Sequence, residues 1–486
     1  MIDVAIPIMP FVDGRSVPAT GDGFEMRSPL SGRSMGAYGT ASEADIDGAV
    51  ASTRRAFEDG RWTDLAPSRR KALLLKLADL IDRDGAKIDR IDATQMGKPI
   101  GTALCNAQSG AHYVRYCAEA FDKIAGDVLM SDRASFIAQC RVPHGVVAGV
   151  ASWNFPFFVA LLKAVPAIAA GNCVVLKPSE IAPGSALMLA QLAAEAGFPD
   201  GVLNVVPGTG QIAGRALGLH ADVDMLTFTG STQVGKRFLE YSGQSNMKKL
   251  LLECGGKSPQ IFFDDGIDLD AAADAISGLI LCNQGQWCSA GSRLLVERSI
   301  ERDLVERIKA RFEAVRAGDP LDPSTTYGPI ASSGQLDRIE THVSAARAGA
   351  ALVTGGERMR GQLSDRFFAP TLFRDVAPDS PLAREEIFGP VLAVMAFDGE
   401  EQAAALANGT DFGLYAFLWT TRIDRAMRMA RRVRSSIQVR SSFIASEGAG
   451  FSAWSEPAGQ SGIGVEGGMR GIESYLRQQS VSFLHG

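Results

Sequence analysis

Apolar positions in the first part of the chain predict several helices behind a short irregular start. Up to about residue 33, turn signals such as Asp13-Gly14 predict irregular or hairpin structure. Apolar residues at helical spacing then predict helices over 42–57, 68–83, 87–96 and 102–123. Ser42 and Asp45 resemble a capping box at the start of the first helix. None of these helices carries obvious chemistry, so we expect them to cover the face of a sheet.

From residue 136 onward, short apolar runs alternate with helix-like runs. Strands are predicted at 145–151, 173–176, 202–206 and 224–228, and helices are predicted at 152–170, 184–196, 211–219 and 232–241. After Glu253 the alternation resumes, with strands at 260–263 and 293–297 and helices at 269–281 and 300–315. Strands without polar positions are typical of parallel sheets that are covered on both faces. The pattern therefore predicts an α/β fold of two domains, with a boundary near 250–256 and further α/β units to about Val439.

Two segments of the pattern need separate interpretation. The run 157–176 is apolar enough to raise the question of a membrane span, but Lys163, Pro166 and Asn172 interrupt it. It predicts a buried helix followed by a buried strand. The tail 480–483 alternates polar and apolar residues, which predicts an edge strand that is blunted or paired with another subunit.

Composition and charge narrow the class of protein. A chain of 486 residues is too long for one domain with a single hydrophobic core. Its content of 46% hydrophobic and 21% charged residues is typical of a globular enzyme. A net charge of −6 without a basic block argues against a nucleic-acid partner. Residues 1–10 lack a basic start and a cleavage site, so we expect no export signal, no membrane association and a cytoplasmic location. Seven cysteines without a Cys-x-x-Cys pair, and five scattered histidines, predict reduced thiols and no metal site.

Cys288 is the candidate nucleophile. It lies in a segment rich in glycine and amide side chains between the helix at 269–281 and the strand at 293–297. Connections between regular elements are where a scaffold usually presents reactive groups. The small neighbours would allow a substrate carbonyl and backbone N–H groups to approach the sulfur. A buried packing cysteine is the alternative interpretation.

Two segments are candidate dinucleotide-binding sites, although no strict Gly-x-Gly-x-x-Gly motif is present. Residues 208–214 resemble this motif but have one residue too many before the last glycine. Residues 228–235 are the better candidate, because they follow a strand and open a helix. There Gly230 allows close approach, and Ser231 with the first helical N–H groups offers donors to a pyrophosphate. A plain N-cap at Ser231 is an equally favoured interpretation of this segment alone.

Lys177-Pro178-Ser179-Glu180 follows a predicted strand, where ligands bind in open α/β sheets. Glu180 would accept hydrogen bonds from an adenosine ribose and would repel a 2′-phosphate, which favours NAD over NADP. A solvated surface pair is the alternative interpretation of Lys177 and Glu180.

Taken together, six segments resemble the aldehyde dehydrogenase superfamily, in that family's order and over nearly the whole chain. They are Trp153-Asn154-Phe155-Pro156, Lys177-Pro178-Ser179-Glu180, Phe228-Thr229-Gly230-Ser231, Glu253-Cys254-Gly255-Gly256-Lys257-Ser258-Pro259, Gly285-Gln286-Trp287-Cys288 and Glu385-Glu386-Ile387-Phe388-Gly389-Pro390.

The resemblance implies a role for each matching residue. Cys288 is the nucleophile, Asn154 donates to the oxyanion, and Glu253 activates the hydrolytic water. Lys163 and Glu466 match positions implicated in relaying protons from that base. Cofactor positions are Trp153, Lys177, Glu180, Gly208, Phe228, Gly230, Ser231, Val234, Glu386 and Phe388. Substrate positions are Phe155, Val159, Leu162, Trp287, Ser289, Phe451 and Trp454.

The resemblance also implies a domain organisation and an assembly. The NAD-binding domain would span 1–124 and 142–250, and the catalytic domain 251–440. Residues 125–141 and 470–486 would form an oligomerisation element, and 441–469 a loop region at the substrate mouth. A homodimer or homotetramer is expected.

The implied chemistry is self-consistent. A thiolate adds to an aldehyde to give a thiohemiacetal, whose oxyanion needs donors placed in advance. Loss of hydride to the nicotinamide leaves a thioester, and a carboxylate then activates water for hydrolysis. Glu253 argues for hydrolysis, because family members that pass the acyl group to coenzyme A generally lack this base.

Some positions depart from the family pattern. Cys254 stands where an apolar residue is more usual, and we favour a packing role for it. The segment 454–460 lacks the usual Gly-Gly pair and lysine, and Val465 replaces a common arginine. These departures affect substrate and assembly predictions rather than the chemistry.

The expected substrate lining is apolar and aromatic. It predicts a neutral, hydrophobic aldehyde of the aromatic, terpenoid or medium-chain kind. An aminoaldehyde from polyamine breakdown is the alternative, with Glu447 or Glu456 as an anchor for the ammonium group. Two other classes stay open: a non-redox cysteine acyl-transfer enzyme and a silent structural protein.

Overall fold

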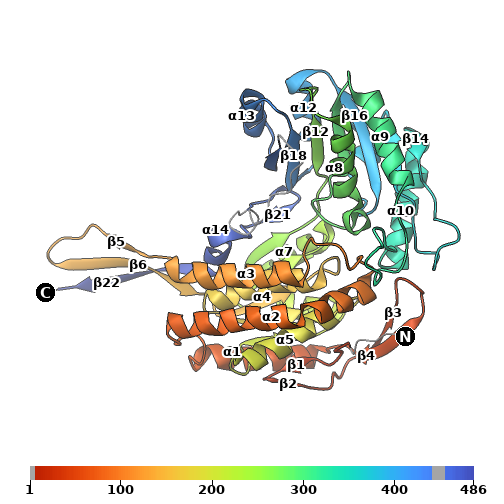
Figure 1. Cartoon of the computed structure of the whole chain (residues 1–486). Coiled ribbons are helices and arrows are strands. Elements are labelled where there is room, and N and C mark those ends of the chain that lie inside the picture. The colour runs from red at the N-terminus through yellow and green to blue at the C-terminus, as the bar shows by residue number, and fades with distance from the viewer. Residues whose placement is uncertain (1–5, 441–454, 486) are drawn as a thin grey trace.

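The chain forms two α/β lobes and a protruding β arm (Figure 1). The computed structural model describes residues 6–440 and 455–485. Within those ranges, no helix is both long enough and apolar enough to cross a membrane. The fold class predicted from the sequence is confirmed, because parallel sheets covered by helices form both lobes.

The first lobe is built on an eight-stranded sheet with the order β2-β1-β9-β8-β7-β10-β11-β21. The five central strands, which are β9, β8, β7, β10 and β11, are parallel to one another. The outer strands β1, β2 and β21 are antiparallel to their neighbours. The strands are β1 (Phe11–Val12), β2 (Arg15–Ser16), β7 (Val146–Val150), β8 (Cys173–Lys177), β9 (Leu203–Val205), β10 (Met225–Thr229), β11 (Lys249–Glu253) and β21 (Gly462–Ile463).

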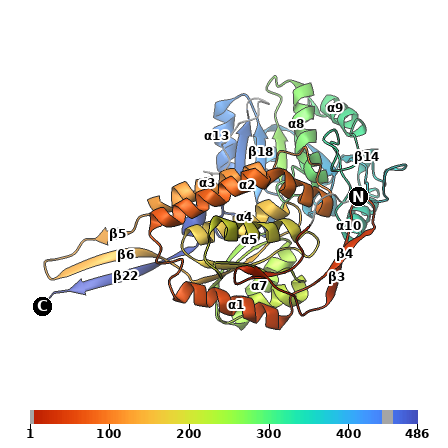
Figure 2. The same cartoon turned by 60° about the horizontal axis from the view of Figure 1, so that its bottom comes forward.

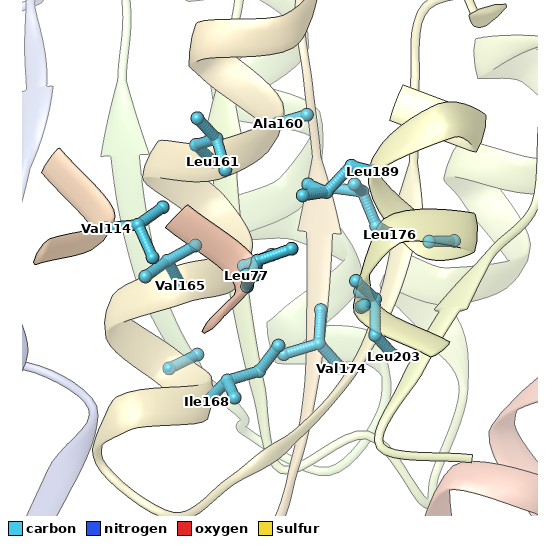
Figure 3. Close-up of a cluster of buried hydrophobic side chains, with 14 of the residues drawn as sticks. Leu77, Val114, Ala160, Leu161, Val165, Ile168, Val174, Leu176, Leu189 and Leu203 are labelled. Atoms are coloured by element: carbon cyan, nitrogen blue, oxygen red, sulfur yellow. The ribbon is translucent and has the colours of Figure 1, made fainter. Parts of the chain in front are cut away.

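Helices cover both faces of this sheet. One face carries α2 (Pro67–Met96), α3 (Ala107–Ala120), α4 (Pro156–Ala169) and α5 (Gly184–Ala196), and the other carries α1 (Glu43–Glu58), α6 (Arg215–Leu219) and α7 (Thr232–Gln244). Successive residues of a strand point to opposite faces of the sheet and belong to different hydrophobic cores. Val174 packs against α4 on one face, and Val175 packs against α1 on the other. Val165 of α4 lies beside Val114 of α3, and Ile168 of α4 extends toward Val174 of β8 (Figure 3). The strands are therefore buried on both sides, as their continuous apolar pattern predicts.

Three helix boundaries differ from the prediction. The two helices expected over 68–83 and 87–96 are one helix, α2, because Gly85 is accommodated inside it where α2 passes close to Ala107 of α3. The helix expected from residue 102 begins at Ala107, because the Asn106 side chain accepts from the Ser109 N–H and caps it. The helix expected over 211–219 begins as a wider π-type turn (Gly210–Gly214) before α6. The capping box of Ser42 and Asp45 is present at α1.

The second lobe contains a seven-stranded sheet with the order β14-β15-β16-β13-β12-β18-β19, parallel except at β14. Its strands are β12 (Pro259–Phe262), β13 (Arg293–Glu297), β14 (Ala351–Thr354), β15 (Thr371–Arg374), β16 (Val391–Phe397), β18 (Tyr415–Trp419) and β19 (Ser436–Arg440). Its helices are α8 (Leu269–Leu281), α9 (Glu301–Glu313), α10 (Ser333–Ala346), α11 (Pro381–Arg384), α12 (Gly399–Ala407) and α13 (Ile423–Arg432).

The arm is a three-stranded antiparallel sheet with the order β22-β6-β5, and it extends away from both lobes in two views (Figures 1 and 2). Its strands are β5 (Asp127–Leu129), β6 (Ser135–Pro143) and β22 (Leu476–Leu484). The tail expected to be an edge strand is β22, and it is longer than the predicted 480–483. Smaller elements are β3 (Gly23–Arg27) with β4 (Ser34–Gly39), β17 (Phe412–Gly413) with β20 (Ala458–Gly459), and α14 (Gly468–Glu473).

Candidate active site

The carboxyl ends of three neighbouring strands in the first sheet bring the candidate residues together. Asn154 follows β7, Ser231 follows β10, and Glu253 is the last residue of β11. Cys288 comes from the second lobe, between α8 and β13. Asn154, Ser231 and Cys288 line one cavity of about 110 Å³, which also contains Glu386. Residues far apart in the sequence thus meet between the two lobes.

The loop before Cys288 has an unusual backbone that its side chains hold in place. Asn283, Gln284 and Gly285 have consecutive positive φ angles of 48°, 55° and 70°. The Asn283 amide donates to the Asn154 carbonyl oxygen at 2.9 Å, and it thereby ties the loop to the first lobe. The Gln286 side chain donates to the Asn283 carbonyl oxygen and accepts from the Ala331 N–H. This backbone requires support, because non-glycine residues in the left-handed region are strained.

The Cys288 thiol is half-buried, and its sulfur lies 3.9 Å from the Ser289 hydroxyl oxygen. Burial, with the nearby carboxylates of Glu253 and Glu386, raises the pKa of Cys288 to about 12. The raised pKa favours the protonated thiol near neutral pH. Its deprotonation requires a proton acceptor or a change in its surroundings.

Glu253 lies in a buried charge cluster. Its side chain is 9% exposed, and Oε1 has no hydrogen-bond partner among the described residues. Burial and the Glu466 carboxylate raise the pKa of Glu253 to about 8, against the opposing effect of Lys163. The Lys163 ammonium is fully buried and forms a short ion pair with Glu466, whose side chain is 14% exposed. Glu253, at the end of β11, thus lies within electrostatic range of an ion pair whose acidic member, Glu466, is partly exposed.

Asn154 is oriented as a hydrogen-bond donor. The Ser152 hydroxyl donates to Asn154 Oδ1 at 2.7 Å, which leaves the Nδ2 amide as the donor. The Asn154 side chain is 5% exposed and lines the same cavity as Cys288. A buried, fixed amide beside a nucleophile is suited to stabilise an oxyanion.

The candidate nicotinamide end of the site is held by the loop after α11. The Glu386 Oε1 atom accepts from the Gly256 N–H at 3.0 Å, and burial raises the pKa of Glu386 to about 7. Phe388 has a φ of 58° and contacts the Trp153 ring edge-on at 5.4 Å between centroids. The Gln335 amide donates to the carbonyl oxygens of Ile387 and Phe388, which fixes that strained loop.

The candidate adenosine end is a separate cavity of about 370 Å³ beside α7. The buried Lys177 ammonium donates to the carbonyl oxygens of Pro178 and Gly208, and it lies 3.6 Å from a Glu180 carboxylate oxygen. Glu180 and Val234 line this cavity. The alternative of a solvated surface pair fails for Lys177, which is 2% exposed.

Ser231 lines the inner cavity, and Val234, three residues further along the chain, lines the adenosine cavity. Ser231 caps α7 by accepting from the Val234 N–H, and this N-cap role is compatible with a pyrophosphate at the same helix end. Gly230 and Thr229 line the inner cavity, and the buried Thr229 hydroxyl has no partner among the described residues. Phe228 packs in the core below and supports this turn.

Comparison with known proteins decides the family. Residues 17–481 match the model of the aldehyde dehydrogenase family. The chain belongs to that family. It is 42% identical to the NADP/NAD-dependent aldehyde dehydrogenase PuuC of Escherichia coli over 89% of this chain and 88% of that protein. It is 39% identical to the aminoacetaldehyde dehydrogenase of Pseudomonas aeruginosa over 89% of this chain and 87% of that protein.

A solved structure agrees. The crystal structure of an indole-3-acetaldehyde dehydrogenase complexed with NAD⁺ matches with a TM-score of 0.95 and 39% identity, over 99% of this chain and 97% of that chain. The chain is therefore an aldehyde dehydrogenase that uses NAD. The interpretations as a silent scaffold and as a non-redox acyl-transfer enzyme are set aside by this family membership.

The candidate substrate residues of this aldehyde dehydrogenase fall into two groups. Phe155, Val159, Leu162 and Trp287 pack in or against one hydrophobic core, and Ser289 adjoins the nucleophile. Phe451 and Trp454, with the possible ammonium anchor Glu447, lie outside the described residues. Glu456 is described and is exposed.

Several residues that contact the candidate site have no motif that would reveal them. Ser152 orients Asn154, Gln335 fixes the Phe388 loop, and Arg338 lines the inner cavity. Two residues of the family-like segment 253–259 also lie near the site. Lys257 is buried near Glu386, and its Nζ has no hydrogen-bond partner among the described residues. Cys254 is buried in the core under α7, which agrees with the packing role favoured for it.

Proposed function

We propose that this aldehyde dehydrogenase oxidises a neutral, hydrophobic aldehyde to the free carboxylic acid. The buried Glu253 carboxylate, which carries a raised pKa of about 8, supports hydrolysis most directly. A base with a pKa near the working pH is suited to take a proton from water. Phe155, Val159 and Trp287, which the family resemblance places at the substrate tunnel, are apolar and favour a neutral substrate of the aromatic, terpenoid or medium-chain kind.

In the proposed mechanism, the Cys288 sulfur attacks the aldehyde carbon and its proton leaves to a base. The oxyanion of the thiohemiacetal accepts hydrogen bonds from the Asn154 amide and the Cys288 backbone N–H. Bound NAD would supply the acceptor for the hydride that the thiohemiacetal carbon loses, and Glu386, Phe388 and Trp153, which line the cavity, would hold its nicotinamide end. The acyl group then remains on Cys288 as a thioester.

Deacylation depends on Glu253 and the charged residues near it. Glu253 takes one proton from water and the hydroxide attacks the thioester. The product leaves as its carboxylate, and the second proton of the water returns to the Cys288 sulfur. The ion pair of Lys163 and Glu466 then offers the proton on Glu253 a route toward solvent, because Glu466 is partly exposed.

The deciding experiment follows NADH absorbance with purified protein, NAD and a panel of aldehydes. The panel contains benzaldehyde, octanal, citral, an aminoaldehyde and succinic semialdehyde. We expect the neutral hydrophobic members to give the highest kcat/KM. Cys288→Ala should reduce NADH formation to background, whereas Cys140→Ala, on the arm strand β6, should leave it unchanged. A free acid product, identified by mass spectrometry, distinguishes hydrolysis from acyl transfer.

An aminoaldehyde is the second candidate substrate. The relative from Pseudomonas aeruginosa is named for aminoacetaldehyde, whereas the solved indole-3-acetaldehyde dehydrogenase is named for an aromatic aldehyde. Exposed Glu456 is a possible anchor for an ammonium group. A preference for the aminoaldehyde in the panel, lost in Glu456→Gln, would replace the hydrophobic substrate while leaving the mechanism intact.

A further inference from the structure

The segment 458–463, which we call the strap, joins the two lobes. Its first strand, β20, pairs with β17, and β17 lies directly before β18 of the second-lobe sheet. Its second strand, β21, pairs with β11 and forms one edge of the first-lobe sheet. Gln460 and Ser461 lie between these two strands, where the chain passes from one lobe to the other. The position of one lobe relative to the other therefore depends in part on the contacts of these two residues.

Ser461 anchors the strap to both lobes from inside the protein. It is fully buried, and its carbonyl oxygen accepts from the Cys254 N–H at 2.8 Å, next to the end of β11. Its hydroxyl oxygen accepts from the Gly413 N–H of β17 at 3.0 Å. Loss of a buried anchor of this kind would disturb folding. A variant of Ser461 therefore cannot separate a structural role from a role in the reaction.

Gln460 also contacts both lobes, but its side chain is exposed. Toward the first lobe, its Oε1 atom accepts from the Lys236 ammonium at 3.2 Å, and its carbonyl oxygen accepts from the Thr232 hydroxyl at 3.0 Å. Toward the second lobe, its N–H donates to the Asp411 carbonyl oxygen at 2.8 Å, and its Nε2 atom donates to an Asp411 carboxylate oxygen at 3.3 Å. The two ends of one amide side chain thus hold one lobe each.

These contacts connect the two ends of the proposed dinucleotide site. On the first lobe, Thr232 is the first residue of α7, whose N-terminal end is the place proposed for the pyrophosphate. On the second lobe, the Asp411 carboxylate lies 3.7 Å from the guanidinium of Arg384, which comes two residues before Glu386 in the chain. Glu386 lines the inner cavity, where the nicotinamide end is proposed to bind. Gln460 therefore stands between the two elements that would hold the cofactor.

A cavity of about 790 Å³ opens between the same elements. Its lining includes Thr232, Lys236, Gln460, Arg338 and Glu386. It adjoins the inner cavity, because Arg338 and Glu386 line both. The larger cavity thus offers a route by which a ligand leaves the inner cavity, and Gln460 forms part of its wall.

We propose that Gln460 is a positioning residue that holds α7 and the Glu386 loop at the separation suited to the cofactor, and so slows the release of NADH. A site that is fixed before its ligand arrives loses less free energy on binding, and in many enzymes the opening of such contacts limits product release. Removal of one hydrogen bond changes an equilibrium by roughly two- to tenfold. The proposal goes beyond aldehyde oxidation, and it rests on the dinucleotide placement proposed above.

The test measures the release of NADH in the absence of any aldehyde. Stopped-flow fluorescence would follow NADH as excess NAD displaces it from the enzyme, and a fluorescence titration would give its Kd. The proteins are the wild type, Gln460→Ala, Asp411→Ala, the double variant and the control Gln244→Ala. Gln244 is an exposed glutamine at the opposite end of α7 and lines neither of the two cavities. The Tm of each protein, from differential scanning calorimetry, separates a positioning effect from a loss of stability.

Gln460→Ala should raise the rate constant for NADH release by roughly three- to tenfold, with a similar rise in Kd. Its Tm should fall by less than about 2 °C, because substitutions of exposed residues change stability little. Asp411→Ala should also speed release. The double variant should release NADH no faster than the faster single variant, because both substitutions remove the same contact. Gln244→Ala should match the wild type.

Three results would overturn the proposal. Release at the wild-type rate in Gln460→Ala would mean that this side chain does not set the separation of the two elements. Faster release together with a larger fall in Tm would mean that Gln460 serves folding instead. Effects of Gln460→Ala and Asp411→Ala that multiply in the double variant would mean that the two residues act independently. No aldehyde is present, so failure of the proposed hydrolysis or substrate preference would not affect these outcomes.

Discussion

At the scale of the residue, Glu253 sets the pH dependence of the proposed hydrolysis. A general base works only when it is ionised. Burial raises the pKa of Glu253 to about 8, so its ionised fraction falls as the pH drops below that value. We expect the deacylation rate to rise from pH 6 to pH 9, by about tenfold per unit well below the pKa. Steady-state and single-turnover NADH measurements across this range would show the profile.

Glu253→Gln separates the two halves of the reaction. Without the base, Cys288 still forms the thioester, so a burst of one NADH per active site should precede turnover slowed by about 10²- to 10⁴-fold. The steep pH profile should also disappear. Glu306→Gln, an exposed glutamate on α9, is the control and should behave as the wild type. Wild-type turnover in Glu253→Gln would show that another group activates water.

Trp287 is a second residue whose role is open to test. Its indole donates to the Leu279 carbonyl oxygen at 3.1 Å, and its ring packs against the cores of both lobes. We expect Trp287→Ala to widen the substrate tunnel and to raise the ratio of kcat/KM for bulky over small aldehydes by roughly tenfold. Trp287→Phe keeps a ring and should change the ratio less. If the ratio is the same in Trp287→Ala as in the wild type, Trp287 does not line the tunnel.

The sequence alone predicted candidate site residues where they belong to local motifs. Cys288, Glu253 and Asn154 each lie in a short segment with distinctive neighbours. In the structure Cys288 and Asn154 line one cavity, and Glu253 at the end of β11 lies near enough to affect the pKa of Cys288. Gln335 and Arg338 could not be assigned in this way. Their significance arises from contacts with residues distant in the chain, and such contacts leave no local pattern.

At the scale of the element, the loop before Cys288 depends on Gly285. Its φ is 70°, and a Cβ there would lie 2.2 Å from the Gly389 carbonyl oxygen. Gly285→Ala therefore combines an unfavourable backbone conformation, worth about 1–3 kcal/mol, with a backbone clash. We expect a lower Tm by differential scanning calorimetry and a large loss of NADH formation, because the loop also positions Cys288.

A second glycine provides the matched control for that prediction. Gly278 lies on the exposed side of α8, and a Cβ there would meet no atom within 4 Å. Gly278→Ala should keep activity and stabilise the helix by up to about 1 kcal/mol. Equal Tm and activity in the two variants would show that the left-handed loop is not required.

Element types were predicted well, and element ends less well. The helix at 269–281 and the strand at 293–297 match α8 and β13, because strong periodicity and flanking glycines define them. The division of α2 into two helices was wrong. Gly85 is a helix-weakening residue locally, but packing of α2 along α3 and α5 outweighs that local preference.

At the scale of the whole molecule, the domain limits remain proposals. β11 belongs to the first sheet and β12 to the second, and both flank the boundary expected near 250–256. We propose an NAD-binding domain of 1–124 and 142–250 and a catalytic domain of 251–440, with 441–469 at the substrate mouth. The sequence could not place the lobes relative to one another, because that arrangement depends on side chains that meet between them. The cytoplasmic location also stays a prediction.

The arm has features of an oligomerisation element. β22 pairs with β6 over nine residues, and the paired rings of Phe136 and Phe483 lie 6.1 Å apart. Large apolar side chains of the arm are nevertheless exposed: Val128 at 69%, Met130 at 101%, Phe483 at 55% and Leu484 at 80%. The arm also leaves β22 and β5 as sheet edges. Exposed apolar side chains beside open strand edges favour contact with another subunit.

We therefore propose a homodimer or homotetramer in which this arm contacts a second copy. The double variant Phe483→Asp with Leu484→Asp should dissociate the assembly, because it places charges in an apolar contact. Size-exclusion chromatography with light scattering would show a wild-type mass of two or four chains and a variant mass of one. Ser482→Asp, which adds a charge at an exposed polar position of the same strand, should keep the assembly. Circular dichroism should be the same in all three proteins, because the arm extends away from both lobes. A wild-type monomer, or a double variant with unchanged mass, would exclude this surface as the subunit contact.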